Sequence, residues 1–231
     1  MKIDWQWVPY EFRRLGGMGQ RMPGLILLPF IALGGLMQFL GAQPIQIARI
    51  LTAALELGIP LGAGIVAAVV VGDDPGIDLQ LATTTSYRLT ALRRLALIIA
   101  WHGGIALAWS VLLTLAGWWA APQSFLPGQL IWLAPLLWFV SVGALPALGL
   151  RSGTAGTAVL GGVWVLENVF HDLVRTRAWL RPFFFVMTTY APGDGGWLEN
   201  RLELIGTAAI LLLGLLFVLG NSERLATRGE A

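Results

Sequence analysis

The sequence contains no cysteine and few charged residues. Its 231 residues include no Cys and two His, and its charged fraction of 12% is about half that of an ordinary soluble domain. The absence of Cys excludes disulfides, thiol nucleophiles and Cys-ligated metals. With 56% hydrophobic residues, a soluble protein could not cover its own surface, whereas lipid tolerates such a surface. Composition therefore predicts an all-α, polytopic membrane protein with one transmembrane domain over residues 1–231.

Sequence motifs for catalysis and nucleotide binding are also missing. The only lysine is Lys2, so the chain cannot build the GxxxxGK[ST] phosphate-binding loop. No HExxH, GxSxG or carboxylate-rich metal motif occurs, and two His residues are too few for a His-based metal site without help from carboxylates elsewhere. No basic patch is dense enough for nucleic acid. We therefore expect no enzyme activity from this chain alone, no bound metal or cofactor, and no nucleic-acid partner.

Long runs without charge predict six membrane spans, because a span needs about 20 mostly apolar residues. The interval 95–150 has no Asp, Glu, Lys or Arg, and the turn APQSFLPG in its middle divides it into a hairpin. The second run tolerates one charge, Glu56, and the fifth run is short and ends in charged residues. The predicted spans are residues 24–40, 50–72, 95–120, 130–150, 153–170 and 204–220.

The distribution of basic residues predicts a multi-pass protein of the plasma or inner membrane with both termini in the cytoplasm. With six spans, the side that holds both termini carries ten of the 15 Arg and Lys residues. Cytoplasmic loops normally carry this excess. A five-span alternative would move the basic 171–201 loop inside and the C-terminal tail outside, and we prefer six. The opposite side then holds Arg49, Arg175, Arg177, Arg181 and Arg201.

The N-terminal segment 1–21 has the pattern of an amphipathic helix. Its apolar residues recur at helical spacing on one face, while its charged residues lie off that stripe. Such a helix is typical of the membrane interface, and we expect it on the cytoplasmic surface. The residues of the stripe are Trp5, Val8, Phe12 and Leu15.

Two further segments lie between the spans. Residues 73–94 form a polar cytoplasmic loop, in which Asp78 can cap a short helix. Residues 171–201 are too apolar for an ordinary loop and too interrupted for a span, which predicts an extracytoplasmic re-entrant or interfacial hairpin. Irregular backbone at membrane depth must be buried in protein or line a wet cavity.

Polar side chains within the predicted spans are the candidate functional groups, because such groups are costly in lipid and mark functional sites. They are Glu56 in the second span, His102 in the third, and Glu167, Asn168 and His171 at the outer end of the fifth. Glu167 and His171 share a helical face at i, i+4 and could pair. Two interpretations stay open: a hydrogen-bonded clamp between helices, and a gate or proton-coupled site.

Small residues in the second span predict close helix contacts. Gly58 and Gly62 form a GxxxG pattern, and Gly64 follows. Small residues let helix backbones approach closely. We interpret these glycines as packing positions within one bundle, with a dimer face as the alternative.

The cytoplasmic loop carries the most informative stretch, DLQLATTTSYRLTALRR from Asp78 to Arg94. It resembles the ABC-2 type transporter permease family, which places an acidic residue and then a pattern like LLATPVSRRRLLLGR between its second and third spans. Thr84 stands where that family often has Pro, and Asp73 and Asp74 stand where it often has an upstream Glu. The layout is similar too: an N-terminal interface helix, six spans, and a re-entrant segment before span 6.

The resemblance implies the membrane subunit of an ATP-driven transporter of the type V exporter kind. A separate ABC ATPase subunit would bind ATP and Mg²⁺, and a second permease copy or a paralogue would complete the pathway through the lipid bilayer. The few polar groups in the spans favour a hydrophobic or amphipathic substrate. The residues implied to couple to the ATPase are Asp78, Leu79, Leu81, Ala82, Thr83, Thr84, Thr85, Ser86, Tyr87 and Arg88.

Two alternatives from other classes remain. One is a structural subunit of a larger membrane complex, with no transport and no ATPase partner. The other is an intramembrane enzyme that acts on lipids, for which Glu167, Asn168, His171 and Asp172 would be the only polar cluster at one depth.

Overall fold

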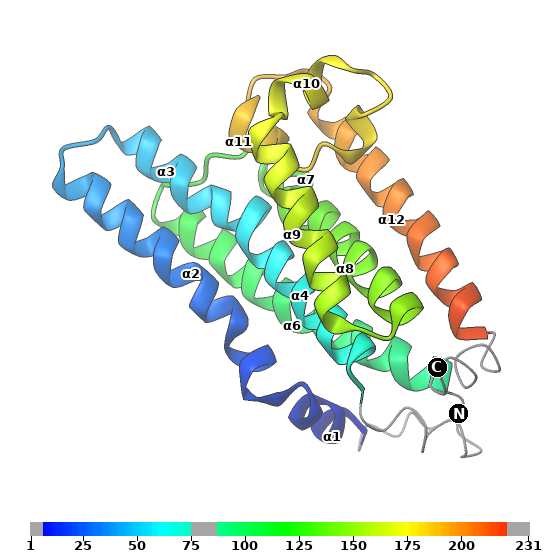
Figure 1. Cartoon of the computed structure of the whole chain (residues 1–231). Coiled ribbons are helices and arrows are strands. Elements are labelled where there is room, and N and C mark those ends of the chain that lie inside the picture. Colours follow the sequence, from blue (N-terminus) through cyan, green and yellow to red (C-terminus); the bar gives the residue numbers. More distant parts are fainter. Residues whose placement is uncertain (1–6, 75–86, 221–231) are drawn as a thin grey trace.

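The chain folds as a bundle of long helices, shown in Figure 1 as a computed structural model that describes residues 7–74 and 87–220. Every regular element among these residues is helical. In chain order the elements are α1 (Trp7–Arg14), α2 (Gly16–Phe39), α3 (Pro44–Ala53), the π-helical turn η1 (Ala54–Gly58), α4 (Ile59–Gly72), α6 (Tyr87–Leu115), α7 (Phe125–Gly128), α8 (Leu130–Leu150), α9 (Gly153–Val169), α10 (His171–Thr176), the 3-10 turn η2 (Arg181–Phe183), α11 (Met187–Tyr190) and α12 (Trp197–Gly220).

Several of these helices fit a multi-pass membrane protein. Within the described ranges, five are long and apolar enough to cross a bilayer: Gly19–Phe39, Pro44–Gly72, Tyr87–Leu115, Phe125–Leu150 and Trp197–Gly220. The expected all-helical class is thereby confirmed for these residues. Helix α9 has 17 residues, fewer than the roughly 20 that a straight span needs. A sixth span therefore stays a prediction.

Several helix boundaries differ from the predicted spans, and two of them have a clear local reason. The second long helix begins at Pro44, where Pro at the first helical position and a Gln43–Gln46 capping box start a helix. Helix α6 ends at Leu115, before residue 120, because Gly117 adopts a left-handed φ of 71° that cannot continue a helix. Helix α12 begins at Trp197 rather than 204, which moves Arg201 from the predicted loop into the helix.

Close glycine contacts place α4 at the centre of the bundle, against α8 and α9. A Cβ atom added at Gly143 of α8 would lie 2.5 Å from the carbonyl oxygen of Gly64 in α4. A Cβ atom added at Gly156 of α9 would lie 2.6 Å from the carbonyl oxygen of Gly143. These distances are shorter than van der Waals contact, so the three backbones can approach this closely only through glycine. Gly58 and Gly62 instead face Ile26 of α2, so this GxxxG pair packs within the chain.

The N-terminal helix α1 lies against α6 rather than standing apart from the bundle. Phe12 packs edge-on against Trp101 with ring centroids 5.1 Å apart, and Leu15 is buried. Val8 is half-buried, and Trp5 lies outside the described residues. The described part of the apolar stripe predicted for the membrane surface is therefore partly covered by protein.

The segment before α12 folds over the opposite end of the bundle, where Figure 1 shows α10 and α11 beyond the ends of the long helices. We call this the α11 end and the other the α1 end. Phe184, Phe185 and Val186 of this segment are fully buried, and the Phe185 ring packs 4.7 Å from that of Phe139 in α8. The stretch 184–188 of the predicted re-entrant segment is therefore buried within protein, whereas most of residues 171–183 are exposed or half-buried. A re-entrant position in the membrane stays a prediction.

The glycine contacts predict a position-specific effect on stability. Gly156→Ala should lower the thermal stability of the purified protein in detergent, because the added methyl group meets the Gly143 carbonyl and overpacking costs about 1–3 kcal/mol. Gly161→Ala in the same helix is the control, because nothing lies within 4 Å of the place its methyl group would take and Ala favours helix by up to about 1 kcal/mol. Equal unfolding temperatures for both variants would contradict this packing.

Candidate functional site

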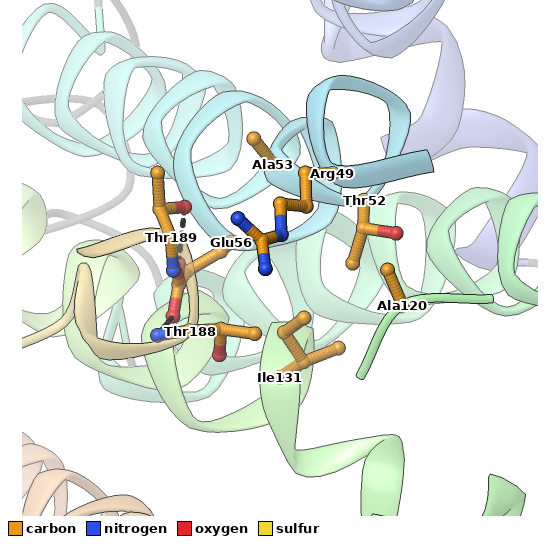
Figure 2. A pocket seen from close by; sticks show the side chains of 8 residues that line it. All are labelled: Arg49, Thr52, Ala53, Glu56, Ala120, Ile131, Thr188 and Thr189. Carbon is orange, nitrogen blue, oxygen red and sulfur yellow. Dashed lines mark hydrogen bonds between the residues drawn. The ribbon is translucent and has the colours of Figure 1, made fainter. Parts of the chain in front are cut away.

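The carboxylate of Glu56 is the centre of a buried hydrogen-bond cluster at the α11 end. It accepts from the backbone N–H of Thr188 at 2.7 Å, and from the N–H and Oγ1 of Thr189 at 2.8 and 2.6 Å. The fourth donor is Nη2 of Arg201 on α12. Figure 2 shows Glu56 reaching from its helix to Thr188 and Thr189. One carboxylate thus joins three separate parts of the chain.

Arg201 provides the complementary charge and extends the cluster. Its Nη1 donates to the carbonyl of Phe185 at 3.0 Å, and its guanidinium lies 5.4 Å from the ring centre of Trp197. The Trp197 indole N–H donates to Oγ1 of Thr188 at 2.8 Å. We call Glu56, Arg201, Thr188 and Thr189 the Glu56 clamp, because together they fix the re-entrant segment to the bundle.

Both charged members of the clamp are fully buried. Burying two charges costs about as much as their attraction returns, so such a pair contributes little net stability over an apolar substitute. Removing one partner is different, because the other is left as an unpaired charge away from water. The Glu56–Arg201 pair therefore adds little to the free energy of unfolding. Its main effect is to select one arrangement of the segment that carries Thr188 and Thr189.

A widened helical turn presents Glu56 to the clamp. Residues Ala54–Gly58 form a π turn, and Pro60 follows just after it. Proline has no N–H to bond the carbonyl four residues earlier, here that of Glu56, and its ring crowds that carbonyl. The π turn accommodates this misfit, and such turns recur at functional sites. Pro60, four residues after an intramembrane Glu, is the sequence signal for this feature.

The polar residues of α9 hold the same segment but do not pair with each other. Oε2 of Glu167 accepts from the Phe185 N–H at 3.1 Å. Asn168 accepts from the Tyr190 hydroxyl at 3.0 Å, and the His171 ring stacks on Tyr190 at 4.1 Å. The predicted Glu167–His171 pair does not form, because each side chain takes a different partner in the re-entrant segment.

His102 lies apart from the clamp. It is fully buried in α6, and its Nδ1 lies 3.0 Å from the carbonyl of Ile98 one turn earlier. Its Nε2 has no hydrogen-bond partner among the described residues. Groups of three or more His, Asp or Glu side chains able to hold a metal ion are likewise not found in the described part of the chain.

A second buried ion cluster lies at the α1 end. Arg94 of α6 donates to Glu11 of α1 at 2.9 Å and to Asp74 at 2.5 Å, and all three side chains are buried. We call these three residues the Arg94 triad. The neighbouring Asp73 accepts from the backbone N–H of Gly153 at 2.7 Å and so caps α9.

Of the residues predicted to couple to an ATPase, the structure describes only the last two. Asp78 to Ser86 fall outside the described residues, whereas Tyr87 and Arg88 begin α6. The Tyr87 side chain is buried and its hydroxyl donates to the Val71 carbonyl at 3.5 Å, while Arg88 is exposed. Tyr87 is therefore packed against the end of α4.

Cavities lie beside both clusters and between two helices. The pocket beside the Glu56 clamp, whose lining residues are drawn in Figure 2, has about 10 Å³, roughly the space of one water molecule, and is lined also by Arg49 and Thr52. A cavity of about 210 Å³ is lined by the Arg94 triad. The largest of the three is an apolar groove of about 400 Å³ between α2 and α4. The groove's wall is completed by Trp164 of α9, whose indole N–H has no hydrogen-bond partner in the described structure.

Sequence reasoning identifies Glu56 and Glu167 but misses most of their partners. Arg201 falls in a predicted loop, and Thr188 and Thr189 are only polar residues in an apolar stretch. The spacing of Trp197 and Arg201 at i, i+4 is the available signal, because it puts an aromatic ring and a cation on one helical face. Glu11 is predicted on the polar side of the interface helix, but it is buried in the Arg94 triad.

Neither family models, nor curated proteins, nor solved structures give a match to this chain. The two ion clusters and the cavities are therefore the features from which function is argued.

In the Glu56 clamp, four donors already occupy the carboxylate, so it is poorly placed to take a proton from a substrate. The contacts at this site hold one segment of the chain in place and leave no free carboxylate oxygen for acid–base chemistry.

The clamp predicts that Glu56→Gln is strongly destabilising. The substitution keeps the shape of the side chain but leaves the Arg201 cation buried without its partner, a loss of about 3–5 kcal/mol. Thermal unfolding in detergent measures the effect. Glu199→Gln is the matched control, because it breaks a solvent-exposed 2.8 Å pair with Arg181 that is worth about 1 kcal/mol or less.

The double variant Glu56→Gln, Arg201→Met removes both charges, and it should be more stable than Glu56→Gln alone. If the Glu56→Gln protein unfolds at the same temperature as the Glu199→Gln control, the claim that Glu56 compensates a buried charge is wrong.

Proposed function

We propose that this chain is the transmembrane permease subunit of an ATP-binding cassette exporter of the ABC-2 type, driven by a separate ATPase subunit. The observation that carries the proposal is the Arg94 triad, which ties together both ends of the cytoplasmic loop and the N-terminal helix. Two copies of the chain, or this chain with a paralogue, would form the pathway. The exported substrate would be hydrophobic or amphipathic.

The triad suits a loop that transmits force. Asp74 follows the last turn of α4, and Arg94 lies two turns into α6, so their 2.5 Å contact holds the two helices together at the base of the loop. Glu11 adds α1 to the same charge. An ATPase that moved residues 78–88 would therefore move α1, α4 and α6 together rather than bend the loop alone.

The central helix extends this connection through the bundle. Pro44–Gly72 is continuous from the clamp at Glu56 to the last turn before Asp74. At 1.5 Å per residue, the 16 residues from Glu56 to the end of α4 at Gly72 span roughly 24 Å, most of the thickness of the hydrocarbon core. A displacement at the α1 end would thus reach the α11 end through one helix, as in rigid-body transport mechanisms.

The alternatives have weaker support. An intramembrane lipid enzyme would need Glu167, Asn168 and His171 to converge on a reacting group. In the structure these residues instead contact Phe185 and Tyr190 of the re-entrant segment. A structural subunit without an ATPase remains the second candidate, and the partner experiment below separates it from a permease.

Copurification tests the proposal most directly. The tagged chain, expressed together with its genomic neighbours and purified in mild detergent, should retain a P-loop ATPase. Recovery of no ATPase would overturn the proposal.

Two substitutions test the predicted coupling segment, residues 78–88. Thr84→Asp or Ser86→Asp should lower substrate-stimulated ATPase activity while the complex still assembles, because each places a charge on the segment proposed to contact the ATPase. Ser152→Asp at the N-cap of α9 is a control outside the loop, where Asp is also a good cap.

The apolar groove supports the substrate class. Its volume of about 400 Å³ falls within the range of small-molecule sites, which are mostly apolar with a few polar groups. Met22, Ile26 and Phe30 of α2 face Leu57 and Leu61 of the central helix across it.

Photolabelling can test this groove without knowledge of the native substrate. A fatty acid with a diazirine on its chain should label the groove residues of α2 and α4 in preference to other lipid-facing positions, as read by peptide mass spectrometry. Leu61→Trp should reduce this labelling several-fold because the larger side chain fills the groove. Leu213→Trp on the exposed face of α12 is the control. Uniform labelling of all exposed helices would contradict a groove-specific site.

A further inference from the structure

We propose that residues 184–190 form a lid at the α11 end, that Glu56 and Arg201 are its latch, and that the lid opens to release substrate. The last part rests on the proposed permease function. The latch itself is argued from contacts, and it can be tested without a substrate or an ATPase.

The polar attachments of the lid involve five side chains, of which Glu56 takes the most. Glu56 receives three hydrogen bonds from Thr188 and Thr189. Further attachments are those of Arg201 to the Phe185 carbonyl, Glu167 to the Phe185 N–H, Trp197 to Thr188 and Asn168 to Tyr190. Releasing Glu56 would free the bonds that hold α11 against the central helix, and such a change suits an element with two discrete positions.

A buried side chain beneath the lid can report lid opening. Thr52 is 3% exposed and lines the small pocket next to Glu56, together with Thr188 and Thr189 of the lid. Opening the lid would bring bulk solvent to this side chain. The exposed Arg49 stands at the edge of the same pocket.

The lid is joined to α12 by a connection that contains three glycines. Gly193, Gly195 and Gly196 lie between α11 and α12, and they are exposed or half-buried. Hinges absorb large backbone changes over a few residues in loops or at element ends. The lid can therefore move while α12 stays in place.

The absence of native cysteine allows a direct test of lid opening. Thr52→Cys introduces the only thiol in the chain at a position whose hydroxyl makes no bond within the described structure, so little is lost on substitution. In lipid nanodiscs, this thiol should react slowly with a polar maleimide. In the Glu56→Gln background, the reaction should be about tenfold faster or more, since hydrogen bonds to charged groups are lost from the closed state. Glu199→Gln should leave the rate unchanged.

Global unfolding is separated from lid opening by a second thiol position. Ser141→Cys lies fully buried in α8, away from the lid, and should stay unreactive in the Glu56→Gln background. If both thiols become reactive, Thr189→Val decides, because it removes only the Oγ1 bond to Glu56 and keeps a branched side chain. A selective increase at Thr52→Cys in that variant supports the latch, and an equal increase at both positions overturns it.

The same reporter distinguishes failure of the latch from failure of the proposed function. With a copurified ATPase present, ATP should raise the reactivity of Thr52→Cys. If Glu56→Gln raises the reactivity but no ATPase copurifies, the latch stands and the permease assignment fails. If Glu56→Gln leaves the reactivity unchanged, the latch is overturned even where ATP drives a different motion.

Discussion

The buried Glu56–Arg201 pair is the interaction around which the α11 end of this bundle is built. Two charges without access to water are tolerable only when they are paired and hydrogen-bonded. The carboxylate takes four donors, and the guanidinium takes a carbonyl and an aromatic face as well, while its Nε has no hydrogen-bond partner among the described residues. These bonds hold the buried part of the re-entrant segment, residues 184–188, against the bundle.

The central helix connects this pair to the second ion cluster. Helix α4 is held against α8 and α9 by backbone contacts at Gly64, Gly143 and Gly156, which leave no space for side chains to adjust. Such close packing couples α4 to α8 and α9. With Glu56 near one end and Asp74 just beyond the other, the same helix carries or adjoins residues of both ion clusters.

Whether a feature of this structure could be predicted from the sequence depends on how far apart in the chain its residues lie. The long helices follow from local apolar runs, and α8 occupies the same interval, Leu130–Leu150, as its predicted span. The ion clusters do not follow, because Glu56 and Arg201 are 145 residues apart and Glu11 and Arg94 are 83 apart. A single sequence shows that a charge lies in an apolar run, but it does not show which distant charge will meet it.

A buried ion pair is well suited to a lid because its net contribution is small while its partial loss is costly. In the closed state both charges are paired; in an open state both would be hydrated, which offsets the broken bond. An intermediate with one charge paired to nothing and shielded from water is unfavourable. The pair thus favours two end states over a continuum, which is the property that a bistable element requires. An apolar contact of equal net strength would weaken gradually and would not define two positions.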